Sequence, residues 1–247
     1  MGFMTHKTKG IVLRAIKYGE TSLVVTIFTE LFGVQTYMVN GVRSSKKSPS
    51  KAGYFQPASI LELVVYHNEQ KSMQRIREFS WDYLYQQVLS DVIKNSIALF
   101  MVELLKKCLK QPEQNTALFY FCEDVLKQLD MADKTVTANI ALFFTLHLTH
   151  FLGFKMNNDY DANNNILDLN EGNFVEMVPA HAHIMEGEQA LLTSHLLKVM
   201  HPDELCGLKL NKDIRSKLLS AYLDYYALHL QDFGTLKTLS VLQEILA

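Results

Sequence analysis

The amino-acid sequence predicts two different parts, a small five-stranded β-barrel followed by an all-α helical domain with a small hairpin insertion. Two observations support this prediction. Up to about Trp81, short runs of β-branched and aromatic residues alternate with turn residues, as in a small antiparallel sheet or barrel. From Asp82 onward, apolar residues recur at helical spacing. We therefore expect one domain over residues 1–81 and a second over residues 82–247.

The expected strands of the first part are Lys9–Ile16, Ser22–Thr29, Val34–Val42, Ser59–Tyr66 and Ser72–Phe79. Turn residues separate most of them, but the connection between the third and fourth strands is long. Five strands with one long connection fit an OB-type barrel. Periodicity alone leaves an SH3-like barrel open.

The expected helices of the second part are Val88–Leu109, Thr116–Leu129, Val136–Leu152, Gly187–Met200, Lys212–Leu230 and Thr238–Leu246. A polar insertion at residues 157–186 separates the third helix from the fourth. Its NILDLNEGNFVEM stretch alternates around Asn170–Asn173, so we expect a small hairpin there.

The composition is that of a globular protein, because 48% of the 247 residues are hydrophobic. No apolar run approaches the roughly 18 to 20 residues that a membrane span needs, so we expect a cytoplasmic protein and no membrane partner. The net charge of -2 is unevenly distributed. Residues 1–80 carry eleven Lys and Arg against five Asp and Glu, whereas the remainder carries thirteen against twenty-one. A basic first domain indicates a polyanionic partner.

The cations concentrate around NGVRSSKKSPSKAGYFQP, the basic segment Asn40–Pro57, which contains no acidic residue. Cations neutralise phosphates and aromatic rings stack on unpaired bases, so this pattern predicts binding of single-stranded nucleic acid. Tyr18, Tyr37 and Tyr54 are candidates for base stacking, with a place in the core as the competing interpretation. The predicted nucleic-acid contacts are Lys7, Lys9, Arg14, Lys17, Arg43, Lys46, Lys47, Lys51, Arg75 and Arg77.

Patterns typical of metal sites and catalysis are incomplete or absent. Asp159, Asp161, Asn163 and Asn165 match the first positions of a calcium loop, but its glycine and final Glu are missing. His181 and His183 would give a metal only two ligands. The three cysteines form no CxxC pair, and no phosphate-binding loop or HExxH helix is present. We expect no metal, no cofactor and no catalytic residue.

Several short motifs follow one another in a specific order and spacing. GIVL at Gly10–Leu13 is followed by YGE at Tyr18–Glu20, TIFT at Thr26–Thr29, a turn at Gly33, and Gly41 with Arg43. The pattern continues through Gln56–Pro57 and Leu61–Leu63 and ends in HLQDFGTLKTLSVLQEIL. It resembles the RecO family of bacterial DNA repair and recombination mediators, closely over the first domain and more loosely over the second.

The resemblance implies an OB domain followed by a helical domain, and binding rather than catalysis. RecO-like proteins bind single-stranded and double-stranded DNA, anneal complementary strands, and act with RecR to help RecA replace the single-stranded-DNA-binding protein. Many members carry a CxxC…CxxC zinc module in the helical domain, but residues 157–186 contain no cysteine. The sequence therefore predicts a mediator without this zinc module.

Two other interpretations of the sequence remain open. The barrel would bind a protein rather than DNA if the chain were an interaction scaffold whose cations only aid solubility. A nucleic-acid-modifying enzyme with an unrecognised site is the second alternative.

Overall fold

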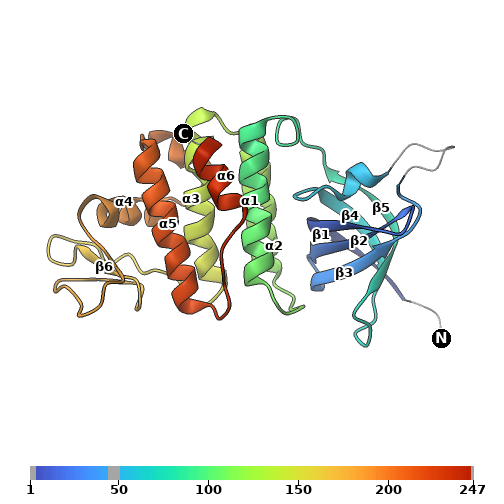
Figure 1. The fold of residues 1–247 in the computed structure, drawn as a ribbon, viewed down its shortest axis with the longest axis horizontal. Helices are drawn as coiled ribbons and strands as arrows, with labels where there is room; N and C mark the ends of the chain where they lie inside the picture. Colours follow the sequence, from blue (N-terminus) through green and yellow to red (C-terminus); the bar gives the residue numbers. More distant parts are fainter. Residues whose placement is uncertain (1–3, 44–50, 246–247) are drawn as a thin grey trace. The chain divides into compact units, whose positions relative to one another are not determined.

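The structure is a computed structural model that describes residues 4–43 and 51–245 (Figure 1). The described residues form two compact units. One comprises Met1–Ser90 with Val102–Lys127, and the other comprises Asp91–Met101 with Gln128–Ala247. The division falls within two helices, and the domain boundary after residue 81 stays a prediction.

The first unit contains a closed barrel of five strands, in the order β1-β2-β3-β5-β4. The strands are β1 (Thr5–Tyr18), β2 (Ser22–Thr29), β3 (Gly33–Val39), β4 (Ile60–Tyr66) and β5 (Gln74–Tyr83). Neighbours are antiparallel except β3 and β5, which are parallel. This order confirms the predicted OB-type barrel over the SH3-like alternative.

Strand β1 is longer than predicted because it pairs with two different strands along its length. Its first half pairs with β4 and its second half pairs with β2, with an irregularity between Val12 and Arg14. Gly10 lies where the two pairings overlap. A Cβ atom there would lie 2.5 Å from Ile27 Cγ2 and 2.9 Å from Leu63 Cδ1, so the barrel closes tightly at this point.

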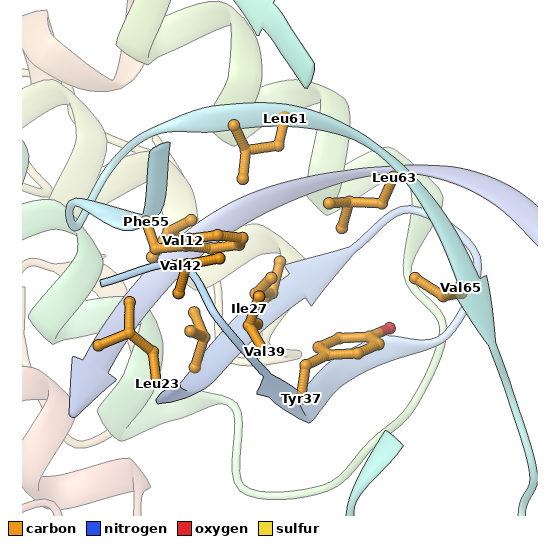
Figure 2. Close-up of a cluster of buried hydrophobic side chains, with 11 residues drawn as sticks. Val12, Leu23, Ile27, Tyr37, Val39, Val42, Phe55, Leu61, Leu63 and Val65 are labelled. Atoms are coloured by element: carbon orange, nitrogen blue, oxygen red, sulfur yellow. The ribbon is translucent and has the colours of Figure 1, made fainter. Parts of the chain in front are cut away.

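Alternate residues of the strands form a hydrophobic interior, as Figure 2 shows. Tyr37 of β3 is fully buried there, and Val42 lies just beyond the strand. A short 3-10 helix, η1 (Ala52–Phe55), adds the buried ring of Phe55. The complete cluster is Val12, Leu23, Val25, Ile27, Tyr37, Val39, Val42, Phe55, Leu61, Leu63 and Val65.

The helices are α1 (Val92–Cys108), α2 (Thr116–Met131), α3 (Lys134–Phe151), α4 (Gly187–Lys198), α5 (Lys212–His229) and α6 (Thr238–Ile245), with a 3-10 helix η2 (Pro202–Gly207). Helix α3 is almost entirely buried and packs against α4, α5 and η2. Its start is fixed by Asp133, whose side chain accepts the backbone N–H of Val136. The predicted helical part is confirmed. Among the described residues, no helix has both the length and the hydropathy to cross a membrane.

The predicted hairpin insertion is also present, with one additional strand. Strands β6 (Ile166–Asp168) and β7 (Asn173–Val175) pair in antiparallel fashion, and β8 (Ile184–Met185) pairs with the other edge of β6. Asp168 organises the turn because its carboxylate accepts the backbone N–H groups of Asn170 and Glu171.

Candidate nucleic-acid interface

Strand pairing places two predicted cations on the outside of the barrel. Arg14 of β1 lies opposite Thr26 of β2, and Arg75 of β5 lies opposite Met38 of β3, whereas the alternate residues of these strands face the core. Arg14 and Arg75 are both exposed. We call the surface over β2, β3, the second half of β1 and the start of β5 the outer barrel face. OB-type barrels bind oligonucleotides on the corresponding strands and on the loops after β1 and β4.

Two hydrogen bonds hold described parts of the basic segment. The guanidinium of Arg43 donates to the carbonyl of Gly19 at 3.0 Å, in the turn between β1 and β2. The backbone N–H of Lys51 donates to the carbonyl of Val42 at 2.8 Å, so these two residues of the segment lie close together. Lys51 is exposed. Lys46 and Lys47 lie outside the described residues.

The other predicted cations differ in their surroundings. Lys17 is exposed at the end of β1. It pairs with Leu23, whose side chain faces the core, whereas Arg14 pairs with Thr26, so Lys17 and Arg14 do not lie on the same side of the strand. Arg77 forms an exposed ion pair with Glu78, with 3.2 Å between Nε and Oε1. Lys7 pairs with Glu62 at 2.8 Å, and both of their side chains are largely exposed. Exposed pairs of this kind exchange readily with phosphates.

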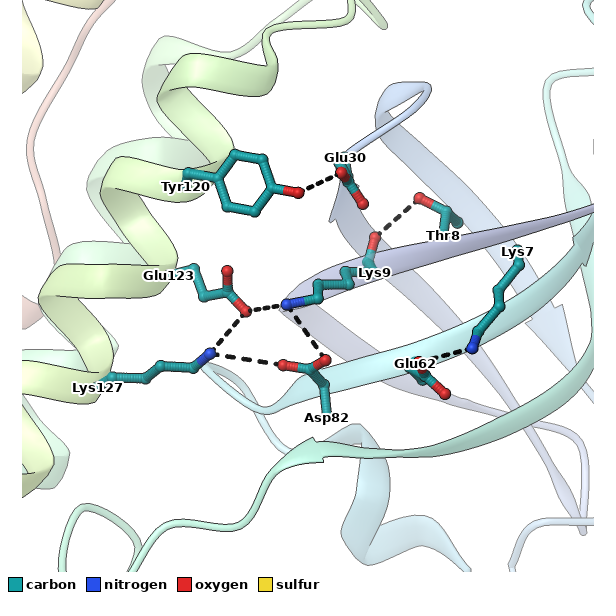
Figure 3. A network of polar contacts seen from close by, with 9 residues as sticks. All are labelled: Lys7, Thr8, Lys9, Glu30, Glu62, Asp82, Tyr120, Glu123 and Lys127. Carbon is teal, nitrogen blue, oxygen red and sulfur yellow. Dashed lines mark hydrogen bonds and ion pairs between the residues drawn. The ribbon is translucent and has the colours of Figure 1, made fainter.

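Lys9 has a different environment, because its ammonium lies between two carboxylates (Figure 3). Its Nζ is 2.9 Å from Glu123 Oε1 and 3.3 Å from Asp82 Oδ1. Lys127 approaches the same carboxylates at 2.9 and 3.6 Å. We call Lys9, Asp82, Glu123 and Lys127 the four-charge network; all belong to the first unit. It joins β1 and β5 to helix α2.

The network perturbs the titration of its members. Burial opposes the charge of Lys9, but the hydrogen bond and charge of Glu123 outweigh burial and raise the pKa of Lys9. Burial likewise opposes the charge of Glu123, but hydrogen bonds from Lys127 and Lys9 lower its pKa. Both groups are therefore held in their charged forms by each other. Lys9 serves the packing of α2 on the barrel, and its charge is already compensated without DNA.

The three residues predicted to stack on bases differ in their exposure. Tyr18 is 59% exposed at the end of β1. Tyr37 is 0% exposed inside the barrel, so it has no free face for a base and its prediction as a stacking residue is wrong. Tyr54 is half-buried, and its ring stacks on Trp81 with 4.7 Å between centroids. One face of Tyr54 is therefore occupied by the protein.

A groove beside the β4–β5 hairpin was missed by sequence reasoning. Its volume is about 580 Å³. It takes side chains from β3, from the hairpin loop and from the start of β5, including Met38, His67, Lys71, Met73, Gln74 and Arg75. Among these residues, only Arg75 is a predicted nucleic-acid contact. The parallel pairing of β3 with β5 creates the groove, and no local sequence pattern reveals that pairing.

In the insertion of the second unit, the residues that match the first positions of a calcium loop form a hydrogen-bonded turn. Asp161 accepts the backbone N–H groups of Asn163 and Asn164, each at 2.7 Å, and these bonds lower the pKa of its carboxyl group. His181 Nε2 lies 3.3 Å from Asp168 Oδ1. Within residues 4–43 and 51–245, no three side chains of His, Cys, Asp or Glu gather as ligands for a metal ion.

Known proteins are similar to this chain over nearly its whole length. The sequence model described as "Recombination protein O N terminal" matches residues 4–84, and "Recombination protein O C terminal" matches residues 89–239. Proteins named "DNA repair protein RecO" from Flavobacterium psychrophilum and Christiangramia forsetii are 35% and 34% identical to this chain over 242 residues. One from Azobacteroides pseudotrichonymphae is 31% identical over 242 residues. Each alignment covers 98% of this chain and 99% of the relative.

Proposed function

The chain belongs to the RecO family, and from this premise we propose that its barrel binds DNA to mediate recombination during DNA repair. The proposal rests mainly on one observation, the cations on the outside of the barrel. Arg14 and Arg75 point outward from their strands, and Arg43 and Lys51 of the basic segment are held by contacts with Gly19 and Val42. Cations of this kind neutralise the phosphates of a polyanion.

The basic segment suits the annealing of complementary strands. Annealing requires that repulsion between two phosphate backbones is screened while the bases stay available for pairing. Lysine is a flexible point charge, so Lys46, Lys47 and Lys51 can follow a moving backbone, whereas arginine is a rigid fork. We assign the lysines to screening and Arg14 and Arg75 to holding one strand.

The family implies partners besides single-stranded and double-stranded DNA. We propose that the chain acts with RecR to help RecA replace the single-stranded-DNA-binding protein, and that it does so in the cytoplasm at the nucleoid. Its contribution is binding rather than catalysis. The acidic second part of the chain, with thirteen Lys and Arg against twenty-one Asp and Glu in residues 81–247, is suited to protein contacts.

Fluorescence anisotropy with a labelled, unstructured oligonucleotide tests the DNA contacts. If about six cations contact phosphates, log K against log salt has a slope of about -4, since each contact on a single strand contributes about -0.7. Changing Arg43, Lys46, Lys47 and Lys51 together to Ala removes four contacts and should reduce the slope to about -1.5.

Lys209→Ala is the matched control, because Lys209 is an exposed cation of the second unit. It should leave both affinity and slope unchanged. An unchanged slope in the quadruple variant would rule out the basic segment as a DNA contact. Absence of DNA binding by the unaltered protein would favour the protein-interaction scaffold.

A further inference from the structure

The groove beside the β4–β5 hairpin has the size and chemistry of a small-ligand site. Its volume of about 580 Å³ falls within the range of roughly 300–1,000 Å³ that such sites occupy. In the described chain, its lining includes Lys71 and Arg75 and contains no Asp or Glu. We call this feature the hairpin groove. A ligand that fits it has an anionic part.

Two methionines, together with Tyr66 of β4, supply the apolar surface of the hairpin groove. Met38 of β3 is the direct partner of Arg75 in the parallel pairing, and Met73 precedes β5. Met73 is an apolar side chain that is 40% exposed. Methionine side chains are flexible and polarisable, so they adapt to flat aromatic faces. The ligand therefore combines an aromatic face with its negative charge.

The loop that forms one wall of the groove is held by a single buried side chain. Gln74 is 3% exposed. Its Oε1 accepts the N–H of Asn68 at 3.0 Å, and its Nε2 donates to the carbonyls of Asn68 and Lys71 at 2.9 and 2.7 Å. These three bonds fix the path of the loop before any ligand binds, which reduces the entropy lost on binding.

The loop is fixed at its start as well. The ring of His67 stacks on Phe32 with 3.9 Å between centroids and 14° between planes. Burial and the neighbouring His6 lower the pKa of His67, so its imidazole is neutral near neutral pH. The wall of the groove is thus rigid at both ends, whereas Lys71 and Met73 between them are exposed.

We propose that the hairpin groove holds one unstacked nucleotide of a DNA strand, with its base against Met38 and Met73 and its phosphate on Arg75. This inference rests on the proposed DNA binding and adds a defined subsite to it. Arginine suits the phosphate because its planar fork donates two parallel hydrogen bonds. Gln74 is a positioning residue that keeps the loop in place. The remaining cations hold the backbone, while this site holds a base.

NMR of protein labelled with ¹³C at the methionine methyl groups tests the proposal. The probe is a short oligothymidylate, and a strand of equal length with abasic sites is the comparison. Conservative Met38→Leu and Met73→Leu variants assign the two signals. A stacked base should move both methyl signals upfield, whereas the abasic strand should not. Met177, which is 82% exposed in the second unit, should not respond to either strand.

Affinities give a second readout. If one base stacks in the groove, the oligothymidylate should bind at least about fivefold more tightly than the abasic strand. Gln74→Ala should remove this preference while leaving the affinity for the abasic strand unchanged, because a loosened loop loses the base and not the other phosphate contacts. An equal loss for both strands would mean that Gln74 has only a structural role.

The outcomes separate the two proposals. Binding of the oligothymidylate without movement of the Met38 and Met73 signals would overturn the nucleotide site and leave DNA binding intact. Equal movement with the abasic strand would also overturn it. No binding of either strand would contradict the proposed function itself.

Discussion

Among single residues, Lys9 shows how a partly exposed cation can still serve packing. Its side chain is 31% exposed, yet its ammonium contacts Glu123 and Asp82, which are 6% and 12% exposed. Removing one member of such a network leaves buried charges with fewer partners. Lys7, two residues earlier, pairs with Glu62 in an exposed position. The two lysines therefore form a natural comparison.

Lys9→Ala should lower the free energy of unfolding by about 1–2 kcal/mol, less than for a fully buried pair because water screens part of the network. Lys7→Ala should cost about 0.5 kcal/mol or less. Urea unfolding followed by the fluorescence of Trp81, the only tryptophan, measures both. Equal stability losses in the two variants would show that the four-charge network is not formed.

The same network predicts a pH dependence. The pKa of Glu123 is lowered in the folded state, so its contribution to stability is present above 4.5, its ordinary value, and is lost as pH falls through the folded pKa. The pKa of Lys9 is raised, so its contribution is present below 10.5 and is lost as pH rises through the folded pKa. Glu123→Gln should therefore be destabilising at pH 7.

The stability difference between the unaltered protein and Glu123→Gln should shrink as pH falls below about 4.5, because both then carry a neutral group at this position. Urea midpoints at several pH values give the difference directly. A difference that stays constant down to pH 3 would contradict the assigned charge state.

At the level of elements, the turn between β2 and β3 contacts the segment that precedes helix α2. Gly33 has a φ of +61°, and a Cβ atom there would overlap the carbonyl oxygen of Glu113. Both residues belong to the first unit. The glycine is required twice, once for its backbone conformation and once for the close approach of Glu113.

Gly33→Ala should destabilise the protein by more than the roughly 1–3 kcal/mol of the backbone conformation alone. Gly19→Ala isolates that backbone part, because Gly19 has a φ of +56° and nothing within 4 Å of its Cβ position. The difference between the two unfolding free energies measures the contact with Glu113. If the two variants were equally stable, this contact would be absent in solution.

The sequence predicts the strands better than their partners. Strand β2 begins and ends at the predicted residues, since Ser22–Thr29 carries a strong β-branched pattern between two turns. The sequence predicts Tyr37 as a stacking residue although it is buried, because apolar side chains occur on both faces of β3 and alternation alone does not identify the buried face. The parallel pairing of Met38 with Arg75 joins segments far apart in the chain, and no local pattern encodes it. The hairpin groove was missed for this reason.

For the whole molecule, the uneven charge separates two tasks. Residues 1–80 carry eleven Lys and Arg against five Asp and Glu, and the described cations of the outer barrel face belong to this part. The acidic remainder is unsuited to wrapping DNA. A mediator needs both properties, because it must bring a DNA strand together with the proteins that occupy or replace one another on it.

The most direct measurement is the annealing of complementary strands coated with the single-stranded-DNA-binding protein, with and without RecR. We expect that the chain accelerates annealing, that changing both Arg14 and Arg75 to Ala slows it, and that Lys209→Ala does not. An annealing rate no higher than that of the coated strands alone, under both conditions, would contradict the proposed mediator function.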